Sequence, residues 1–321
     1  MTLSILFILL GFFLLYKGGD FLVEGAVSLA RIARLSPMVI GMTVVGFGTS
    51  APELLVSVQA ALAGSPGIAI GNVVGSNIAN IALILGLTAL IAPLPATQAS
   101  LRTDLPFMSL SVALLSLAGL WGTIHRWEGL LALLLLAVFM GWQVVNSRRH
   151  PQNADGQGIC AFRQHGLGTA LLIVAASGLA LVFGARLLVM GATDVAMLIG
   201  TQLGVERGEM ERVIGLTVVA VGTSLPELFA TVMSARKGQS DIALGNIIGS
   251  VTFNILCVVG AASAIAPIHG ADRGFLTDYA VMTGLAALLL GFMYARRCLN
   301  RGGGLLLLAL YLLYLARTCM V

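Results

Sequence analysis

One stretch of this chain occurs twice, and the duplication constrains the architecture more than any other feature. The first copy, at 41–54, reads GMTVVGFGTSAPEL and the second, at 215–228, reads GLTVVAVGTSLPEL. Each is followed by a Gly-Asn segment, GNVVGSNIAN at 71–80 and GNIIGSVTFN at 245–254. All four segments keep one offset of 174 residues (215 − 41) without insertions. A constant offset over such a span indicates an internal duplication.

Each copy of the repeated stretch places a carboxylate in a long apolar run. A carboxylate is costly in lipid, so Glu53 and Glu227 are expected to face the protein interior or a watery cavity. Pro52 and Pro226 precede them and cannot donate a backbone hydrogen bond to the carbonyl four residues earlier. Irregular backbone at membrane depth is tolerated only where it is buried or lines a cavity. Both glutamates are therefore candidate functional residues.

Helical spacing gathers further oxygen donors on the same faces, because residues three and four apart are neighbours on a helix. These residues are Thr49, Ser50, Ser76 and Asn80 in the first half and Thr223, Ser224, Ser250 and Asn254 in the second. Carboxylates, hydroxyls, amides and carbonyls suit Na⁺ and Ca²⁺ rather than thiophilic metals. A single Gly-Thr-Ser in a membrane helix is usually a packing motif. Two interrupted helices at matching positions instead indicate a transport site.

Composition sets the class of protein. The chain of 321 residues is 58% hydrophobic and 10% charged, with a mean hydropathy of +0.98. These values predict an all-α integral membrane protein with spans of about 20 apolar residues. The net charge of +4 is spread over loops and gives no reason to expect nucleic-acid binding. The sequence shows no nucleotide loop, no nucleophile–base constellation and no cysteine spacing typical of a metal cluster. Neither an enzyme nor a prosthetic group is therefore expected.

Hydropathy predicts ten transmembrane helices, five in each half. The expected spans are 3–28, 38–62, 68–91, 104–121, 127–147, 167–196, 211–235, 241–265, 275–295 and 303–318. Because five is odd, the halves have opposite orientations and form an inverted repeat. The predicted organisation is a first repeat at 1–147 (with its duplicated segment at 41–91), a short linker at 148–166, and a second repeat at 167–321 (with its duplicated segment at 215–265).

The basic residues predict the orientation in the membrane. Eleven lie on one side: Arg31, Arg34, Arg102, Arg148, Arg149, Arg163, Arg236, Lys237, Arg296, Arg297 and Arg301. Five lie on the other: Arg126, Arg207, Arg212, Arg273 and Arg317. The excess of positive charge places the first set in the cytoplasm. The linker is then cytoplasmic and both termini lie outside, in a multi-pass protein of the cell inner (plasma) membrane.

The first helix of each half carries further charges that we leave out of the candidate site. They are Lys17, Asp20 and Glu24 in the first half and Arg186 in the second. Asp20 aligns with Arg186, so an ion pair between the two helices is one alternative. Snorkelling of the long basic side chains towards the membrane surface is another.

The paired Gly-Thr-Ser-x-Pro-Glu and Gly-Asn-x-x-Gly-Ser motifs resemble the α-repeats of prokaryotic Na⁺/Ca²⁺ exchangers in the cation/Ca²⁺ exchanger superfamily. The resemblance covers nearly the whole chain. It implies a central Ca²⁺ site at Glu53, Glu227, Thr49 and Thr223. It implies Na⁺ ligands at Ser50, Ser76, Ser224 and Ser250 and at the backbone carbonyls of Gly46 and Ala220. Asn80 and Asn254 would line the middle of the site.

This sequence departs from the family pattern in places. Gly46 in the first copy is replaced by Ala220 at the equivalent position of the second. Residues 251–252 are Val-Thr where the first copy has Asn-Ile. Many relatives have Asp at the position of Asn254. Fewer carboxylates leave less capacity for an additional cation such as K⁺.

The function predicted is exchange of Na⁺ for Ca²⁺ by alternating access, which the resemblance implies at three Na⁺ per Ca²⁺. One Ca²⁺ neutralises two glutamates, and several Na⁺ cannot share the region with it without strong repulsion. The first alternative is a Ca²⁺/H⁺ or other cation exchanger, since paired buried glutamates can also carry protons. The Gly-Asn-x-x-Glu-His pattern of the proton-coupled relatives is absent, which favours sodium. The second alternative is a cation channel. The expected partners are the two ions and the lipid bilayer, and the chain is expected to be a monomer.

Overall fold

The computed structural model describes residues 2–120, 122–149, 165–202, 220–269 and 273–320, which are mainly helical. The first half contains α1 (Thr2–Ala33), α2 (Pro37–Ile40), η1 (Gly41–Val45), α3 (Gly46–Thr49), α4 (Ala51–Leu62), α5 (Pro66–Ile78), η2 (Ala79–Ile84), α6 (Leu85–Ile91), η3 (Ser100–Asp104), α7 (Leu105–Leu120) and α8 (Arg126–Arg149), where η denotes a π-helical segment. The second half contains α9 (Leu167–Gln202), α11 (Ala220–Thr223), α12 (Leu225–Arg236), α13 (Ser240–Phe253), η6 (Asn254–Val259), α14 (Gly260–Ile265), α15 (Arg273–Arg296) and α16 (Arg301–Met320).

The predicted spans coincide with helices wherever the structure describes them. Among the described residues, seven segments are long and apolar enough to cross a membrane: Thr2–Ala33, Gly67–Ile91, Ser100–Leu120, Arg126–Arg149, Leu167–Leu198, Ser240–Ile265 and Leu276–Arg296. The pair Pro37–Thr49 and Ala51–Leu62, bent by 47°, provides an eighth. The predicted span 303–318 lies within α16. Of the span 211–235, residues 211–219 lie outside the described part of the chain, and the rest forms α11 and α12. The fold is therefore that of an all-α integral membrane protein.

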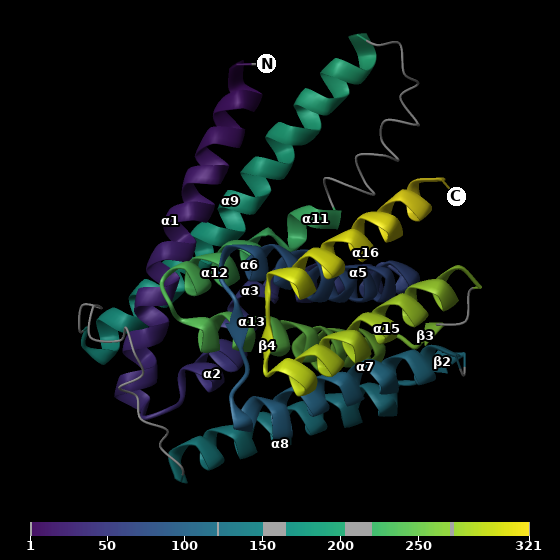
Figure 1. Ribbon diagram of the computed structural model, residues 1–321. Coiled ribbons are helices and arrows are strands. Elements are labelled where there is room, and N and C mark those ends of the chain that lie inside the picture. Colours follow the sequence, from purple (N-terminus) through teal and green to yellow (C-terminus); the bar gives the residue numbers. More distant parts are fainter. Residues whose placement is uncertain (1, 121, 150–164, 203–219, 270–272, 321) are drawn as a thin grey trace.

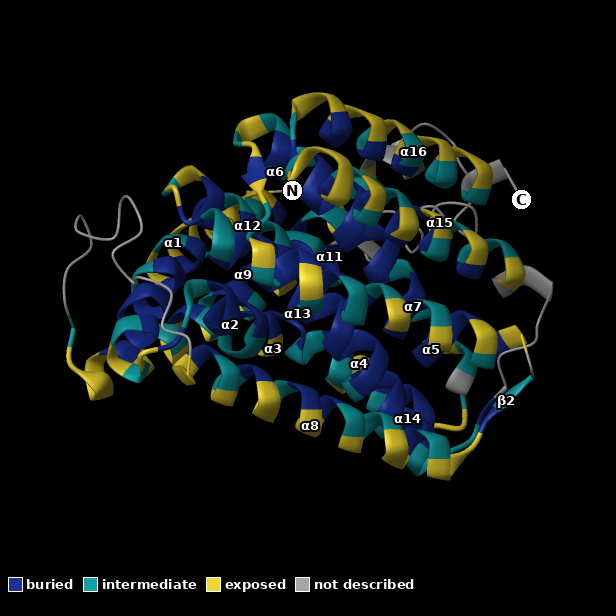
Figure 2. Cartoon of the chain, turned by 60° about the horizontal axis from the view of Figure 1, so that its bottom comes forward, coloured by how far each residue is buried: buried dark blue, intermediate teal, exposed yellow. Residues whose placement is uncertain are grey.

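The duplicated segments form the centre of the molecule. In the most apolar stretch of Ser240–Ile265, 89% of the residues are buried inside the protein. The share is 72% for Gly67–Ile91 but only 22% for α8. Figure 2 shows α13 in dark blue at the centre, whereas α8 presents exposed residues along its outer side. Large apolar side chains on the periphery remain exposed, such as Leu130 at 60%. In a membrane protein such a surface faces lipid.

Two short strand pairs join the halves. β1 (Leu94–Pro95) pairs with β4 (Cys298–Leu299), and β2 (Thr123–Ile124) pairs with β3 (Ile268–His269), both antiparallel. A shift of 174 residues carries β1 onto β3 and β2 onto β4 to within one residue. Each pair is therefore the symmetry equivalent of the other, as expected for an inverted repeat.

The helices α1 and α9 form a separate pair that is steeply inclined to α7, α8 and α15 (Figure 1). Glycines bring their backbones together. A Cβ atom on Gly11 would lie 2.7 Å from the carbonyl oxygen of Gly184, and one on Gly184 would lie 2.9 Å from that of Gly11. Any larger residue at either position would push the two helices apart. Small residues allow this close approach between membrane helices.

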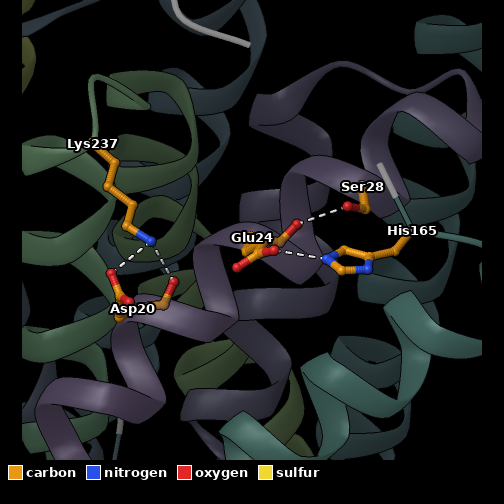
Figure 3. A network of polar contacts seen from close by, with 5 residues as sticks. All are labelled: Asp20, Glu24, Ser28, His165 and Lys237. Carbon is orange, nitrogen blue, oxygen red and sulfur yellow. Dashed lines mark hydrogen bonds and ion pairs between the residues drawn. The ribbon is translucent and has the colours of Figure 1, made fainter. Parts of the chain in front are cut away.

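Charged contacts tie one end of α1 to the rest of the protein (Figure 3). Lys237 Nζ lies 2.6 Å from Asp20 Oδ1 and donates to the Asp20 backbone carbonyl at 2.8 Å. His165 Nε2 lies 2.7 Å from Glu24 Oε1. The alternative of an Asp20–Arg186 ion pair is therefore wrong, and His165, for which the sequence suggested no role, contacts a carboxylate. Within the described residues Arg186 forms no ion pair.

Candidate ion site

In both halves a helix is interrupted immediately before the Pro-Glu pair. α3 ends at Thr49 and α4 begins at Ala51, while α11 ends at Thr223 and α12 begins at Leu225. The proline falls in the first turn of the new helix, where its missing N–H has no partner to lose. Glu53 and Glu227 occupy the same first turn. The local sequence thus explains why each carboxylate stands at a helix start rather than along a continuous helix.

The two glutamates are fully buried, with 0% of each residue exposed. They lie close enough for their negative charges to repel one another. Ser50 Oγ donates to Glu227 Oε1 at 3.0 Å. Thr223 and Ser76 lie beside the carboxylate of Glu53. Each carboxylate is therefore approached by hydroxyl residues of the opposite half, so the two halves build one site.

A second cluster surrounds Thr49. Its hydroxyl lies 3.3 Å from both the Gly46 carbonyl and Asn246 Oδ1, and 3.4 Å from Ser250 Oγ. Ser250 Oγ in turn lies 3.5 Å from the Gly46 carbonyl. The structure thus brings Gly46, Thr49 and Ser250 together. Ala220, the counterpart of Gly46, is the first residue of α11.

Close packing of backbones makes this cluster possible. A Cβ atom on Gly249 would lie 2.4 Å from the Met42 carbonyl oxygen, and one on Gly245 would lie 2.5 Å from that of Met38. Larger residues at these positions would force α13 away from the segment 37–49. The glycines of the Gly-Asn-x-x-Gly-Ser motif therefore bring Ser250 within reach of Gly46 and Thr49.

Two asparagines of the motifs hold the glutamate helices in place, a role that sequence reasoning did not predict. Asn72 Nδ2 donates to the Glu53 carbonyl at 3.3 Å and to Ser57 Oγ at 3.0 Å. Asn246 Nδ2 makes the equivalent bonds, to the Glu227 carbonyl at 3.4 Å and to Thr231 Oγ1 at 2.8 Å. The signal was present in the sequence, because both asparagines and both hydroxyl residues keep the 174-residue offset.

The two asparagines predicted for the middle of the site lie where helices change geometry. Asn80 lies in the π-helical segment η2, and Asn254 begins η6. π-Helical turns are rare and are frequent at functional sites. η2 packs against α12, and η6 packs against α4. The environments differ, however, because Asn254 Nδ2 donates to Asn77 Oδ1 at 3.1 Å. Neither polar atom of the Asn80 side chain has a hydrogen-bond partner in the described chain.

Unpaired oxygen atoms gather at this site. Within the described structure the buried side-chain oxygens without a hydrogen-bond partner include both of Glu53, Oε2 of Glu227, Oδ1 of Asn80, Oδ1 of Asn254 and Oγ of Ser224. Buried polar atoms in native proteins are nearly always paired, and each exception requires an explanation. A cation would satisfy acceptors of this kind, so the donor set fits hard cations such as Na⁺ and Ca²⁺.

A cavity of about 440 Å³ lies between α4, α9 and the interruption before α12. Its lining is mainly apolar and includes Thr223, Pro52 and Pro226, and the exposed side chain of Arg186 also faces it. The cavity brings open space up to Thr223, the residue beside Glu53. Movement of α9 relative to α4 would change the width of this space.

An interrupted helix in each of two inverted halves, with buried carboxylates between them, defines a class of membrane protein: a cation transporter with a duplicated site. Residues 3–145 and 169–320 match the family model described as sodium/calcium exchanger protein. The chain belongs to this family. It is a cation/Ca²⁺ antiporter, not an enzyme.

Individual relatives match over almost their whole length. The sodium/calcium exchanger MaX1 of Methanosarcina acetivorans is 33% identical over 350 residues, covering 98% of each chain. The inner membrane protein YrbG of Escherichia coli is 34% identical, covering 98% of this chain and 97% of YrbG. Among solved structures, the sodium-calcium exchanger NCX_Mj superposes with a TM-score of 0.82 at 31% identity, covering 98% of each chain.

Proposed function

We propose that this antiporter exchanges Na⁺ for Ca²⁺ at the paired glutamates. The observation that supports this most strongly is that three of the four carboxylate oxygens of Glu53 and Glu227 are buried without a hydrogen-bond donor in the described chain. Two ionised carboxylates carry a formal charge of −2, which one Ca²⁺ neutralises. Without a compensating charge, the desolvated pair would be strongly unfavourable.

We assign the ligands from the two clusters around the glutamates. Ca²⁺ binds between Glu53 and Glu227, assisted by Thr49 and Thr223. The flanking Na⁺ positions use the remaining oxygens, those of Ser50, Ser76, Ser224 and Ser250 and the carbonyls of Gly46 and Ala220. Asn80 and Asn254 contribute amide oxygens at the middle of the site.

Exchange follows from competition for one set of carboxylates. A site that already holds Ca²⁺ has no negative charge left to offset Na⁺, and repulsion between unit charges a few ångströms apart is several kcal/mol at an effective dielectric near 20. Each ion must therefore leave before the other binds. A ratio of three Na⁺ per Ca²⁺ would move one net positive charge in each cycle. The access change would use α1 and α9, which pack on each other as a separate pair.

Proton coupling is the second candidate, favoured by the same unpaired oxygens. A proton on Glu53 would also satisfy a buried carboxylate that lacks hydrogen-bond donors. The hydroxyl-rich surroundings favour Na⁺ over protons. A proton on each carboxylate would give the unpaired oxygen of Ser224 no partner, whereas a bound Na⁺ would be coordinated by it.

We place the protein in the cell inner membrane with both termini outside, and we expect it to act as a monomer. The ends of α8 and α15 carry Arg148, Arg149 and Arg296, the predicted cytoplasmic side. The inner-membrane location of YrbG is named for that relative and supports the same placement here.

The decisive experiment measures ⁴⁵Ca²⁺ uptake into proteoliposomes that contain the purified chain. Vesicles loaded with Na⁺ and diluted into choline should accumulate Ca²⁺, whereas vesicles with only a pH gradient should not. Equal uptake with and without internal Na⁺, under a maintained pH gradient, would establish proton coupling instead. Inside-negative and inside-positive potentials should change the Na⁺-driven rate in opposite directions if each cycle moves net charge.

The control is the chain carrying both Glu53→Gln and Glu227→Gln. It keeps the shape of the site but removes both charges, so it should show no gradient-driven uptake. Uptake that continues in this variant would place transport elsewhere in the protein.

A further inference from the structure

A second buried carboxylate lies outside the central site. Asp104 ends η3 at the start of a membrane span, and only 3% of the residue is exposed. A cavity of about 60 Å³ adjoins it, and seven of the lining residues have a side-chain oxygen: Ser36, Thr97, Thr103, Asp104, Gln143, Asn146 and Ser147. One water molecule needs about 10–15 Å³ of such space, so the cavity is large enough for a cation with a few water molecules.

The contacts of Asp104 leave part of its carboxylate unsatisfied. Oδ1 accepts a hydrogen bond from Thr103 Oγ1 at 2.9 Å and another from Gln143 Nε2. No described residue donates to Oδ2, and none forms an ion pair with Asp104. The half-buried side chain of Asn146 also lines the cavity. Gln143 is neutral, so the negative charge has no fixed counter-charge.

The other half of the molecule supplies an internal comparison. Asp278 is the duplicate of Asp104, and the duplicate of Gln143 is Arg317. Arg317 lies close enough to attract Asp278, and its Nη2 donates to Thr277 Oγ1 at 3.4 Å. The second half therefore pairs this carboxylate with a built-in cation.

Part of the polar lining of the cavity is also confined to the first half. The positions equivalent to Asn146 and Ser147 are Met320 and Val321. The second half has Arg317 but lacks counterparts of Asn146 and Ser147. The first half lacks the arginine and has these oxygen donors along a cavity. The carboxylate of the second half thus has an arginine beside it, whereas that of the first half has an oxygen-lined cavity.

We propose that the cavity beside Asp104 binds a monovalent alkali cation such as Na⁺, separate from the transported ions. A single carboxylate of charge −1 is neutralised by a monovalent ion, whereas a divalent ion would leave a buried net charge. The lining offers hydroxyl, amide and carboxylate oxygens, the donors that hard cations prefer. Arg102 and Arg148 stand nearby in the sequence, but their side chains are exposed, so water screens them from the cavity.

The test uses the purified chain with Glu53→Gln and Glu227→Gln, which removes the charges of the central site. Equilibrium binding of ²²Na⁺ to this protein should retain one saturable site per chain. Adding Asp104→Asn should weaken that binding at least tenfold, whereas the matched change Asp278→Asn should leave it intact. Absence of saturable binding in the starting protein, or equal binding with and without Asp104→Asn, would overturn the proposal.

A second variant keeps the carboxylate and supplies the missing cation. Gln143→Arg copies the arrangement at Arg317, so it should abolish this ²²Na⁺ binding while the protein stays folded. Na⁺ should raise the melting temperature of the starting protein relative to N-methyl-D-glucamine, by about 2 °C or more at saturation. The Gln143→Arg variant should lose this dependence on Na⁺. Undiminished ²²Na⁺ binding in a folded Gln143→Arg protein would contradict the proposal even if Asp104→Asn failed to fold.

Discussion

In both halves the helix that carries the glutamate begins after a serine with nearly the same backbone conformation, φ −85° and ψ 4° at Ser50 and φ −89° and ψ 5° at Ser224. The asparagine that bonds to the glutamate carbonyl is also duplicated, as Asn72 and Asn246. The helix interruption and its support are therefore the same in both halves. These features set the position of the carboxylates.

The surroundings of this common frame differ. Asn254 has an amide partner in Asn77, but position 251, the equivalent of Asn77, is Val251, so Asn80 lacks such a partner. α1 is tied down through Asp20, whereas the aligned residue Arg186 of α9 has no ion pair in the described chain. The comparison shows that the duplicated residues set the position of the glutamate helices. The hydrogen bonds of Asn80 and Asn254 and the ion pairs of α1 and α9 are specific to each half.

The largest effect is expected from the duplicated glutamates. Glu53→Gln and Glu227→Gln each remove one of two charges, and one attraction at about 4 Å is worth a few kcal/mol at an effective dielectric near 20. Each variant should lose Ca²⁺ affinity by at least tenfold, and the two losses should be comparable. The concentration dependence of ⁴⁵Ca²⁺ uptake measures this. Glu24→Gln, which removes a contact to His165 outside the site, should have little effect.

If the Glu53→Gln protein is inactive while the folded, membrane-inserted Glu227→Gln protein transports Ca²⁺ normally, a shared site is disproved. A binding site formed by one repeat would then be the better description.

The next effect separates the duplicated asparagines. Asn246→Ala should destabilise the protein more than Asn72→Ala, because Asn246 is 0% exposed and also receives a bond from Thr49, whereas Asn72 is only partly buried. Leaving buried groups unpaired costs about 1–3 kcal/mol for each group. Thermal unfolding in detergent and the apparent Ca²⁺ affinity should both follow the order wild type, Asn72→Ala, Asn246→Ala. The reverse order would show that burial does not control the role of this pair.

A smaller effect should follow from making the first half resemble the second. Asn77→Val removes the acceptor of the Asn254 amide, a buried contact worth about 1 kcal/mol net. The melting temperature should fall, and Ca²⁺ affinity should fall with it if Asn254 is held for ion binding. Val251→Thr, at the equivalent position, should cost less because a helical threonine can donate to the carbonyl four residues earlier. An unchanged affinity in Asn77→Val would exclude Asn254 as a positioned ligand.

The smallest effect concerns the ion pair on α1. Asp20 and Lys237 have side chains that are 29% and 25% exposed, so the pair contributes about 0.2–1 kcal/mol. Asp20→Asn and Lys237→Gln should each change the balance between the two access states up to about fivefold, and the double variant should add nothing further. Accessibility of a single cysteine introduced in the cavity between α4 and α9, probed from each side of the membrane, measures this balance. Lys17→Gln, an exposed position on the same helix, is the control, and strictly additive effects would rule out a coupled pair.

The sequence predicted those parts of the structure that are duplicated or that follow from hydropathy. The helix α13, the interruption at Ser224 and the buried glutamates all follow from composition, proline chemistry and a constant offset. The roles of Asn72 and Asn246 were missed because a Gly-Asn pair has many uses, and only packing shows which carbonyl the amide meets.

Contacts between unrelated segments could not be predicted for a physical reason. Lys237 was counted only as a loop charge, although it reaches Asp20 across more than two hundred positions of the chain. Gln143 meets Asp104 only after α8 folds back along η3 and α7. Such pairings depend on helix tilt and register, which hydropathy does not encode.

The strand pairs that cross between the halves bear on how the chain is made. β1 lies shortly after residue 91, yet its partner β4 begins at residue 298, in the second repeat. During synthesis β1 therefore cannot pair with β4 until the helices between residues 96 and 297 have been made. The other pair, β2 with β3, closes earlier, because its strands are separated by fewer residues. Biogenesis of this protein thus cannot proceed one repeat at a time: the first repeat becomes complete only when the second has been delivered to the membrane.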